Sequence, residues 1–126
     1  MSSRFDTIDP TDLARTCGGV QMQVTQYGYP HDPDGDSQTR AGHGAYHDLA
    51  ANRSVALTDS GLRALGLSRS QVRGGSEWVN INLRGGGTLH RRIDDRAPEA
   101  NKRVDVYQPG GFDRHLAGSA DVSLAR

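Results

Sequence analysis

The sequence has little of what marks several large classes of protein. It contains one cysteine, Cys17, so no disulfide can form within the chain, and we expect a buried or inert thiol. No apolar stretch approaches the length that crosses a bilayer, so we expect no membrane insertion. Fifteen basic and fifteen acidic residues balance each other. Without a net positive field, a non-specific nucleic-acid-binding role is disfavoured.

Length and composition favour one small β-rich domain. A chain of 126 residues fits a single hydrophobic core, which buries roughly two-thirds of the unfolded surface. Only 34% of the residues are hydrophobic and 16 are glycine. Such a composition suits short strands joined by many turns better than a helical bundle.

Alternation of apolar and polar residues predicts six short strands. Thr58 or Asp59 is expected to cap a short helix that runs to Leu65, and Gly66 ends it. The polar segment between the first two strands predicts a long loop. We therefore expect a mainly β fold, a small six-stranded barrel with one or two short helices. The predicted strands are residues 20–27, 54–58, 77–83, 88–94, 102–107 and 120–124.

The N-terminal segment differs from the rest of the chain. Residues 1–18 lack alternation and carry three aspartates, so they are predicted to form an arm outside a barrel domain of residues 19–126. The arm also lacks the apolar run of a secretory signal. We expect synthesis in the cytoplasm, followed by incorporation into a virion or export to the cell envelope by another system. Partner chains in such an assembly are expected to contact the arm.

Two carboxylates, Asp95 and Asp105, each adjoin apolar strand residues in the second half of the chain. Carboxyl groups at the edge of a core have their pKa values shifted by burial and by neighbouring charges, and general acids are made in this way. The alternative is a structural cluster of ion pairs. The arginines nearby are Arg92, Arg96 and Arg103.

Several short motifs resemble the double-psi β-barrel superfamily, which includes rare lipoprotein A, membrane-bound lytic transglycosylase A, the Asp-Asp-Asp domain proteins and expansins. Residues 95–98, Asp-Arg-Ala-Pro, resemble the Asp-Arg-Gly-Pro motif of rare lipoprotein A. Residues 104–108, Val-Asp-Val-Tyr-Gln, resemble a Phe-Asp-Ile-Tyr-Gln segment of lytic transglycosylase A. Residues 24–28 resemble the first barrel strand, which ends in Tyr-Gly, and residues 44–57 are similar to the expansin pattern of a glycine-rich loop before an Ala-Leu strand.

The resemblance implies a six-stranded double-psi barrel that cleaves peptidoglycan as a lytic transglycosylase does. In such enzymes one aspartic acid protonates the glycosidic oxygen and then takes the proton of the muramic acid 6-hydroxyl, which attacks its own anomeric carbon. The likeness to rare lipoprotein A points to Asp95 as this acid, whereas the likeness to lytic transglycosylase A points to Asp105. Rare lipoprotein A also uses a loop glutamate. No glutamate lies between Tyr27 and Ala56 here, and Asp36 is the nearest substitute.

Further residues are candidates for substrate contact. Tyr27, at a strand end, and Tyr107 carry rings that can cover a sugar face, whereas Trp78 is expected to pack in the core. Arg96, within the quoted motif, is a further candidate. His43 is a candidate for a hydrogen bond to a sugar or a carboxylate, with loop solvation as the alternative.

We expect neither a metal nor another cofactor. Asp32, Asp34 and Asp36 have the first three ligand offsets of a calcium-binding loop, but the twelfth position is His43 instead of glutamate. A solvated turn is the alternative to a calcium site, and the question stays open at this level. The loop histidines match no zinc signature.

Two functions of different class therefore follow from the sequence. The first is a peptidoglycan-cleaving enzyme. The second is a non-catalytic barrel that binds cell-wall glycan or serves as a structural part of a phage particle or another assembly.

Overall fold

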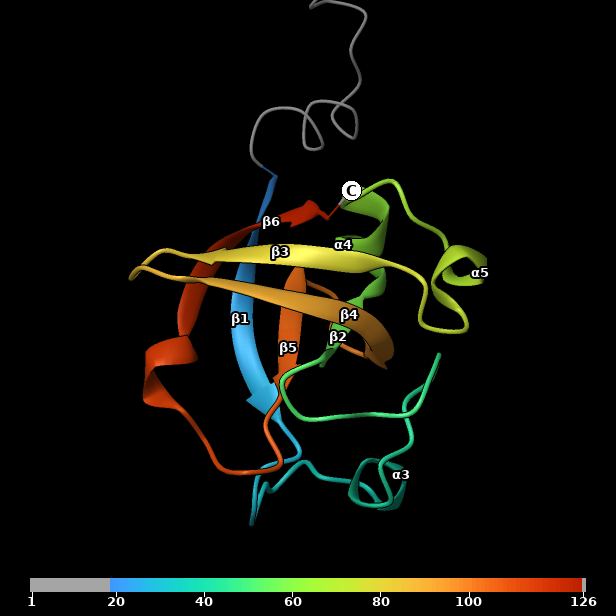
Figure 1. The fold of residues 1–126 in the computed structure, drawn as a ribbon, viewed down its shortest axis with the longest axis vertical. Coiled ribbons are helices and arrows are strands. Elements are labelled where there is room, and N and C mark those ends of the chain that lie inside the picture. Colours follow the sequence, from blue (N-terminus) through green and yellow to red (C-terminus); the bar gives the residue numbers. More distant parts are fainter. Residues whose placement is uncertain (1–18, 126) are drawn as a thin grey trace, which may run out of the picture.

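A computed structural model describes residues 19–125 of the chain. Six strands close into a barrel in the ring order β1-β5-β2-β4-β3-β6 (Figure 1). The protein is therefore mainly β, and the prediction of a small six-stranded barrel is confirmed. The predicted arm and Cys17 lie outside the described residues. The strands are β1 (Val20–Tyr27), β2 (Ser54–Thr58), β3 (Trp78–Leu83), β4 (Thr88–Ala97), β5 (Arg103–Tyr107) and β6 (Gly118–Leu124).

The barrel core follows from the alternation in the sequence. In β1 the side chains of Met22 and Val24 are buried, and in β5 those of Val104 and Val106 are buried, so the residues between them face outward. β2 is an exception, because all five of its residues are buried. Each strand contributes aliphatic side chains to one core, which leaves the polar outer face available for a site.

Three short helices and one 3₁₀ turn, η1 (Arg114–Leu116), connect the strands. The predicted helix is present as α4 (Asp59–Ala64), and its cap Thr58 accepts a hydrogen bond from the Gly61 N–H. The expectation of one or two helices is wrong because α3 (Ser37–Arg40) and α5 (Arg69–Val72) also form. These one-turn helices are too short for a periodic pattern to reveal them.

The arrangement in space places a long loop at one end of the barrel. The chain between β1 and β2, which contains α3, lies beyond the end of β1, whereas α4 lies toward the opposite end (Figure 1). No helix among residues 19–125 is long and apolar enough to cross a membrane.

β4 departs from the prediction at its C-terminal end. It continues to Ala97, three residues beyond the predicted end, and it contains a β-bulge. Val55 pairs with Ile93, but the next residue, Ala56, pairs with Asp95, so Asp94 is the extra residue. The bulge therefore decides which acidic side chain of β4 lies beside Ala56.

The pairing of the strands has an approximate two-fold symmetry. Exchanging β1 with β4, β2 with β5 and β3 with β6 reproduces the same ring in reverse order. The directions agree as well: β1 and β5 are parallel, as are β2 and β4, and the other four pairs are antiparallel. The two halves of the barrel thus have the same pairing pattern.

Candidate functional site

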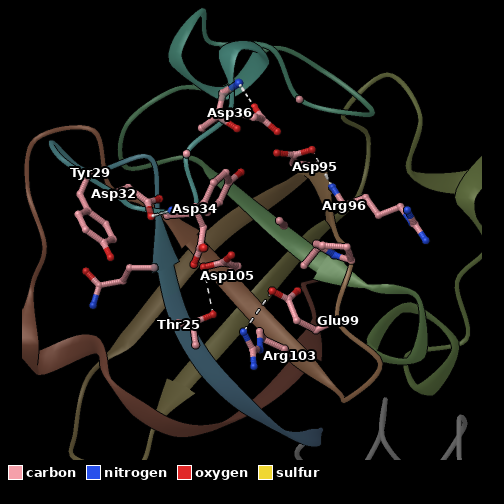
Figure 2. A pocket seen from close by; sticks show the side chains of 18 of the residues that line it. Thr25, Tyr29, Asp32, Asp34, Asp36, Asp95, Arg96, Glu99, Arg103 and Asp105 are labelled. Carbon is pink, nitrogen blue, oxygen red and sulfur yellow. Dashed lines mark hydrogen bonds and ion pairs between the residues drawn. The ribbon is translucent and has the colours of Figure 1, made fainter.

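A groove of about 730 Å³ is lined by side chains of β1, β2, β4 and β5 and by the loop that contains α3 (Figure 2). A groove of this size is in the range of small-molecule and glycan sites. It brings together six of the seven residues predicted to form the site: Tyr27, Asp36, His43, Asp95, Arg96 and Asp105. The seventh, Tyr107, lines a smaller neighbouring cavity of about 370 Å³.

The strand register puts the two central aspartates in one row. Asp105 pairs with Thr25 on one side and with Ala56 on the other, and Ala56 also pairs with Asp95. Directly paired residues point to the same face of a sheet, so the row Thr25–Asp105–Ala56–Asp95 forms one wall of the groove. β2 lies between the strands that carry the two aspartates, and two strand spacings place their backbones about 10 Å apart.

Asp105 is a carboxyl group in a poorly solvated place. Its side chain accepts a hydrogen bond of 3.0 Å from the Thr25 hydroxyl. Burial raises the pKa of Asp105 to about 7, and the negative charges of Glu99 and Asp32 also raise it, while the Thr25 bond and the Arg103 charge oppose the rise. A carboxyl with this pKa holds its proton up to neutral pH and can donate it.

Asp95 is held by the backbone. Its Oδ1 accepts hydrogen bonds of 2.8 Å from the N–H groups of Ala45 and Arg96. The Arg96 guanidinium points away from Asp95 (Figure 2) and forms an ion pair of 2.9 Å with Asp59. Among residues 19–125, neither Asp95 nor Asp105 forms an ion pair with an arginine. Both carboxyl groups are therefore open to a ligand in the groove.

The structural ion-pair cluster is centred on Asp94 instead. This side chain is fully buried and pairs with Arg92 at 2.7 Å and with Arg53 at 3.3 Å. The backbone carbonyl of Asp94 accepts hydrogen bonds from the N–H groups of Tyr46 and His47. Asp94 thus holds the loop that contains Ala45, whose N–H donates to Asp95. Asp94 therefore affects the position of the Asp95 side chain through this loop.

Asp36 has a structural task in the groove wall. It is the N-cap of α3 and accepts a hydrogen bond of 2.7 Å from the Thr39 N–H. This bond holds the pKa of Asp36 below its ordinary value. A carboxyl that is ionised and committed to a cap is a poor proton donor, so the geometry gives no support to Asp36 as the acid.

The acidic loop stabilises its own turns. Asp32 accepts hydrogen bonds from the N–H groups of Gly28 and Asp34, at 2.9 and 3.0 Å. In the described part of the chain, no group of three or more histidine, cysteine, aspartate or glutamate side chains is arranged to hold a metal ion. The two bonds to Asp32 are those of a turn. His43 lines the groove, and its ring lies 3.3 Å from the exposed Asp48 carboxylate.

The aromatic residues divide between groove and surface. Tyr27 lines the groove, and its ring lies 5.5 Å from the Tyr107 ring. The prediction that Trp78 packs in the core is wrong. Trp78 is half-buried and stacks on His90, with 4.7 Å between ring centroids. An alternating pattern identifies the outward face of a strand but not which rings on it find a partner.

Three features of the site escaped the sequence reasoning. Glu99 lines the groove and forms an ion pair of 3.3 Å with Arg103. Phe112 is 57% exposed in the groove lining and forms an edge-to-face pair with Tyr29, with 5.3 Å between ring centroids; the sequence indicated Tyr29 as an aromatic candidate for sugar stacking but not its partner Phe112. Thr25 was detectable as the outward residue of an alternating strand, but its contact with Asp105 depends on the register.

Comparison with known proteins leaves this geometry as the main guide to function. No protein-family model matches the chain. A search of curated proteins also finds no match. The interpretation of the groove therefore rests on its own residues.

Proposed function

We propose that this protein cleaves the glycan strands of peptidoglycan, with Asp105 as the general acid. The observation that carries the proposal is a carboxyl group whose pKa is raised by burial to about 7 in a groove of about 730 Å³. General acids are most effective when their pKa lies near the working pH. Asp95 is instead fixed by two backbone N–H donors, so Asp105 is the better candidate of the two.

The reaction divides between the two carboxyl groups. Protonated Asp105 donates its proton to the glycosidic oxygen as the bond to the anomeric carbon breaks. The Asp95 carboxylate, on the same wall of the groove, stabilises the positive charge that develops on the sugar. The 6-hydroxyl of the muramic acid then attacks the anomeric carbon and gives its proton to Asp105. This step closes a 1,6-anhydro ring and returns Asp105 to its acid form.

The strand pairing supports a barrel of the double-psi type. Two parallel pairs, β1 with β5 and β2 with β4, are related by the approximate two-fold symmetry of the ring. The two aspartates of the quoted motifs lie on strands that both pair with β2. A double-psi barrel has two interlocked halves with equivalent pairing, and the equivalent pairing of the two halves supports this assignment.

Digestion of purified peptidoglycan, with mass analysis for anhydromuramic products, tests the proposal. We expect cleavage that weakens as the pH rises through about 7, because Asp105 then loses its proton. Asp105→Asn should reduce the rate by about 10²–10⁴-fold. Asp121→Asn is the matched control, because Asp121 is exposed on β6 outside the groove lining. Absence of anhydro products at every pH from acidic to neutral would overturn the proposal.

The Tyr29–Phe112 pair favours one alternative, a non-catalytic barrel that binds cell-wall glycan. An aromatic pair in a groove with one exposed ring, here Phe112, is suited to stacking against a sugar. Retention on insoluble peptidoglycan that is lost in Phe112→Ala, with no cleavage by the wild type, would favour this alternative. A role in a phage particle or export system would depend on partner chains, with residues 1–18 as the contact we proposed from the sequence.

A further inference from the structure

The Tyr27 hydroxyl is a buried hydrogen-bond donor at the groove. It is shielded from solvent, and among the described residues it has no partner in hydrogen-bond geometry. A buried polar group without a partner costs free energy, so such groups in folded proteins usually have a function or an unseen partner. The position of the ring restricts what that partner can be.

Tyr27 has little freedom to move. Its ring packs against Tyr107, and its backbone carbonyl accepts a hydrogen bond of 2.9 Å from the Gln108 N–H. A side chain at the following position would crowd the Tyr107 ring, because a Cβ on Gly28 would lie 2.6 Å from it. The hydroxyl is therefore presented at a fixed place.

The Asp95 carboxylate lines the same groove as Tyr27 and is an acceptor for this hydroxyl. Burial raises the pKa of Tyr27 far above its ordinary value, and the negative charges of Asp95 and Asp105 raise it further. The phenol is thus neutral, and able to donate, at neutral pH. Both backbone donors to Asp95 use Oδ1, so Oδ2 is the oxygen that remains for Tyr27.

We propose that Tyr27 is a positioning residue whose hydroxyl donates a hydrogen bond to Oδ2 of Asp95 and fixes this carboxylate in the groove. The inference goes beyond a stacking role for Tyr27, and its kinetic consequence rests on the proposed function. A carboxylate held at three points keeps one orientation toward the substrate. The backbone supplies two of these points from β4 and the loop, and β1 supplies the third through Tyr27.

The kinetic test uses Tyr27→Phe, which removes only the hydroxyl. We expect kcat to fall by about 10–100-fold with KM nearly unchanged, because a hydrogen bond to a charged group is lost while the ring remains. In an Asp95→Asn background the same change should have little further effect on kcat. Tyr46→Phe is the matched control, because the Tyr46 hydroxyl is also buried without a partner among the described residues but Tyr46 lies outside the groove lining. Independent, multiplying effects of the two substitutions would overturn the inference.

A second measurement needs no catalytic activity. NMR of protein labelled with ¹³C at the tyrosine ring carbon that carries the hydroxyl reports hydrogen bonding of each neutral phenol at pH 7, and Tyr27→Phe assigns the Tyr27 signal. Asp95→Asn should shift the Tyr27 signal, because the hydroxyl then meets a neutral amide instead of a carboxylate. An unchanged Tyr27 signal would overturn the inference, whether or not the protein cleaves glycan. A shifted signal in a protein that cleaves no glycan would overturn only the proposed function.

Discussion

Asp105 is an outward-facing strand residue that is nonetheless shielded from water. The alternation of Val104, Asp105 and Val106 puts the aspartate on the outer face of β5. The groove walls then reduce its solvation, and this produces the raised pKa. The raised pKa of Asp105 therefore has two causes. The strand alternation, which is local, places the side chain on the outer face, and the groove walls, which come from distant parts of the chain, reduce its contact with water.

The raised pKa predicts a specific dependence of stability on pH. The folded-state pKa of Asp105 is about 7 and its ordinary value is 3.8. Between these pH values the folded protein holds a proton that the unfolded chain has released. The contribution of Asp105 to the free energy of unfolding therefore falls as the pH rises from about 4 to about 7, by roughly 4 kcal/mol at most.

Asp105→Asn should remove this part of the pH dependence. Urea unfolding at a series of pH values is expected to show that the variant gains stability over the wild type as the pH rises toward 7. The same measurement on Asp121→Asn controls for loss of an exposed charge. Parallel curves for the wild type and Asp105→Asn would show that ionisation of Asp105 does not destabilise the folded protein.

At the scale of the elements, the turn after β1 decides how two tyrosines meet. Gly28 has a φ of +73°, and a Cβ there would lie 2.6 Å from the Tyr107 ring. Gly28→Ala should destabilise the protein by about 1–3 kcal/mol through backbone strain and the clash together. Chemical denaturation measures the loss.

Gly42→Ala separates these two causes. Gly42 has a φ of +81° but open space around it, so this variant carries the backbone strain without the clash. We expect Gly28→Ala to be the more damaging of the two, and to change the NMR signals of the Tyr27 and Tyr107 rings. Equal losses would mean that the ring moves aside freely.

The bulge in β4 is a second element with consequences for the site. It buries Asp94, whose side chain accepts from Arg53, Ser54 and Arg92. Asp94→Ala leaves these donors without their acceptor, and we expect a loss of about 3 kcal/mol in unfolding free energy. Faster hydrogen exchange at the Ala45 N–H should accompany it. Asp48→Ala, at an exposed carboxylate, should change neither quantity appreciably.

At the scale of the whole molecule, closure of the barrel predicts that residues 20–124 fold without the N-terminal segment. Each strand pairs with two neighbours inside this range, so the barrel has no open edge for another segment to cover. Deleting residues 1–18 should therefore leave a single cooperative unfolding transition, with unfolding free energy within about 1 kcal/mol of the intact chain. Thermal unfolding followed by circular dichroism measures this. Loss of the cooperative transition would show that the segment belongs to the folded core.

The strand pattern was predictable because it is local. The first two strands have the predicted limits, and α4 begins at the predicted cap Thr58. Alternation of apolar and polar residues reports which side of a strand meets the core, and a threonine before a helical turn reports a cap. The same reasoning indicated Asp95 and Asp105 as polar residues at the edge of the core.

The tertiary structure alone decided how these residues meet. The ring order joins strands that are far apart in the sequence, and the bulge at Asp94 sets Asp95 level with Ala56 and hence in the row of Asp105. Among the described residues, the arginines form ion pairs with Asp59, Asp94 and Glu99, and not with the two groove aspartates. Strand alternation repeats every two residues and carries no information on the partner strand or its register, so the sequence determined the faces and the fold determined the site.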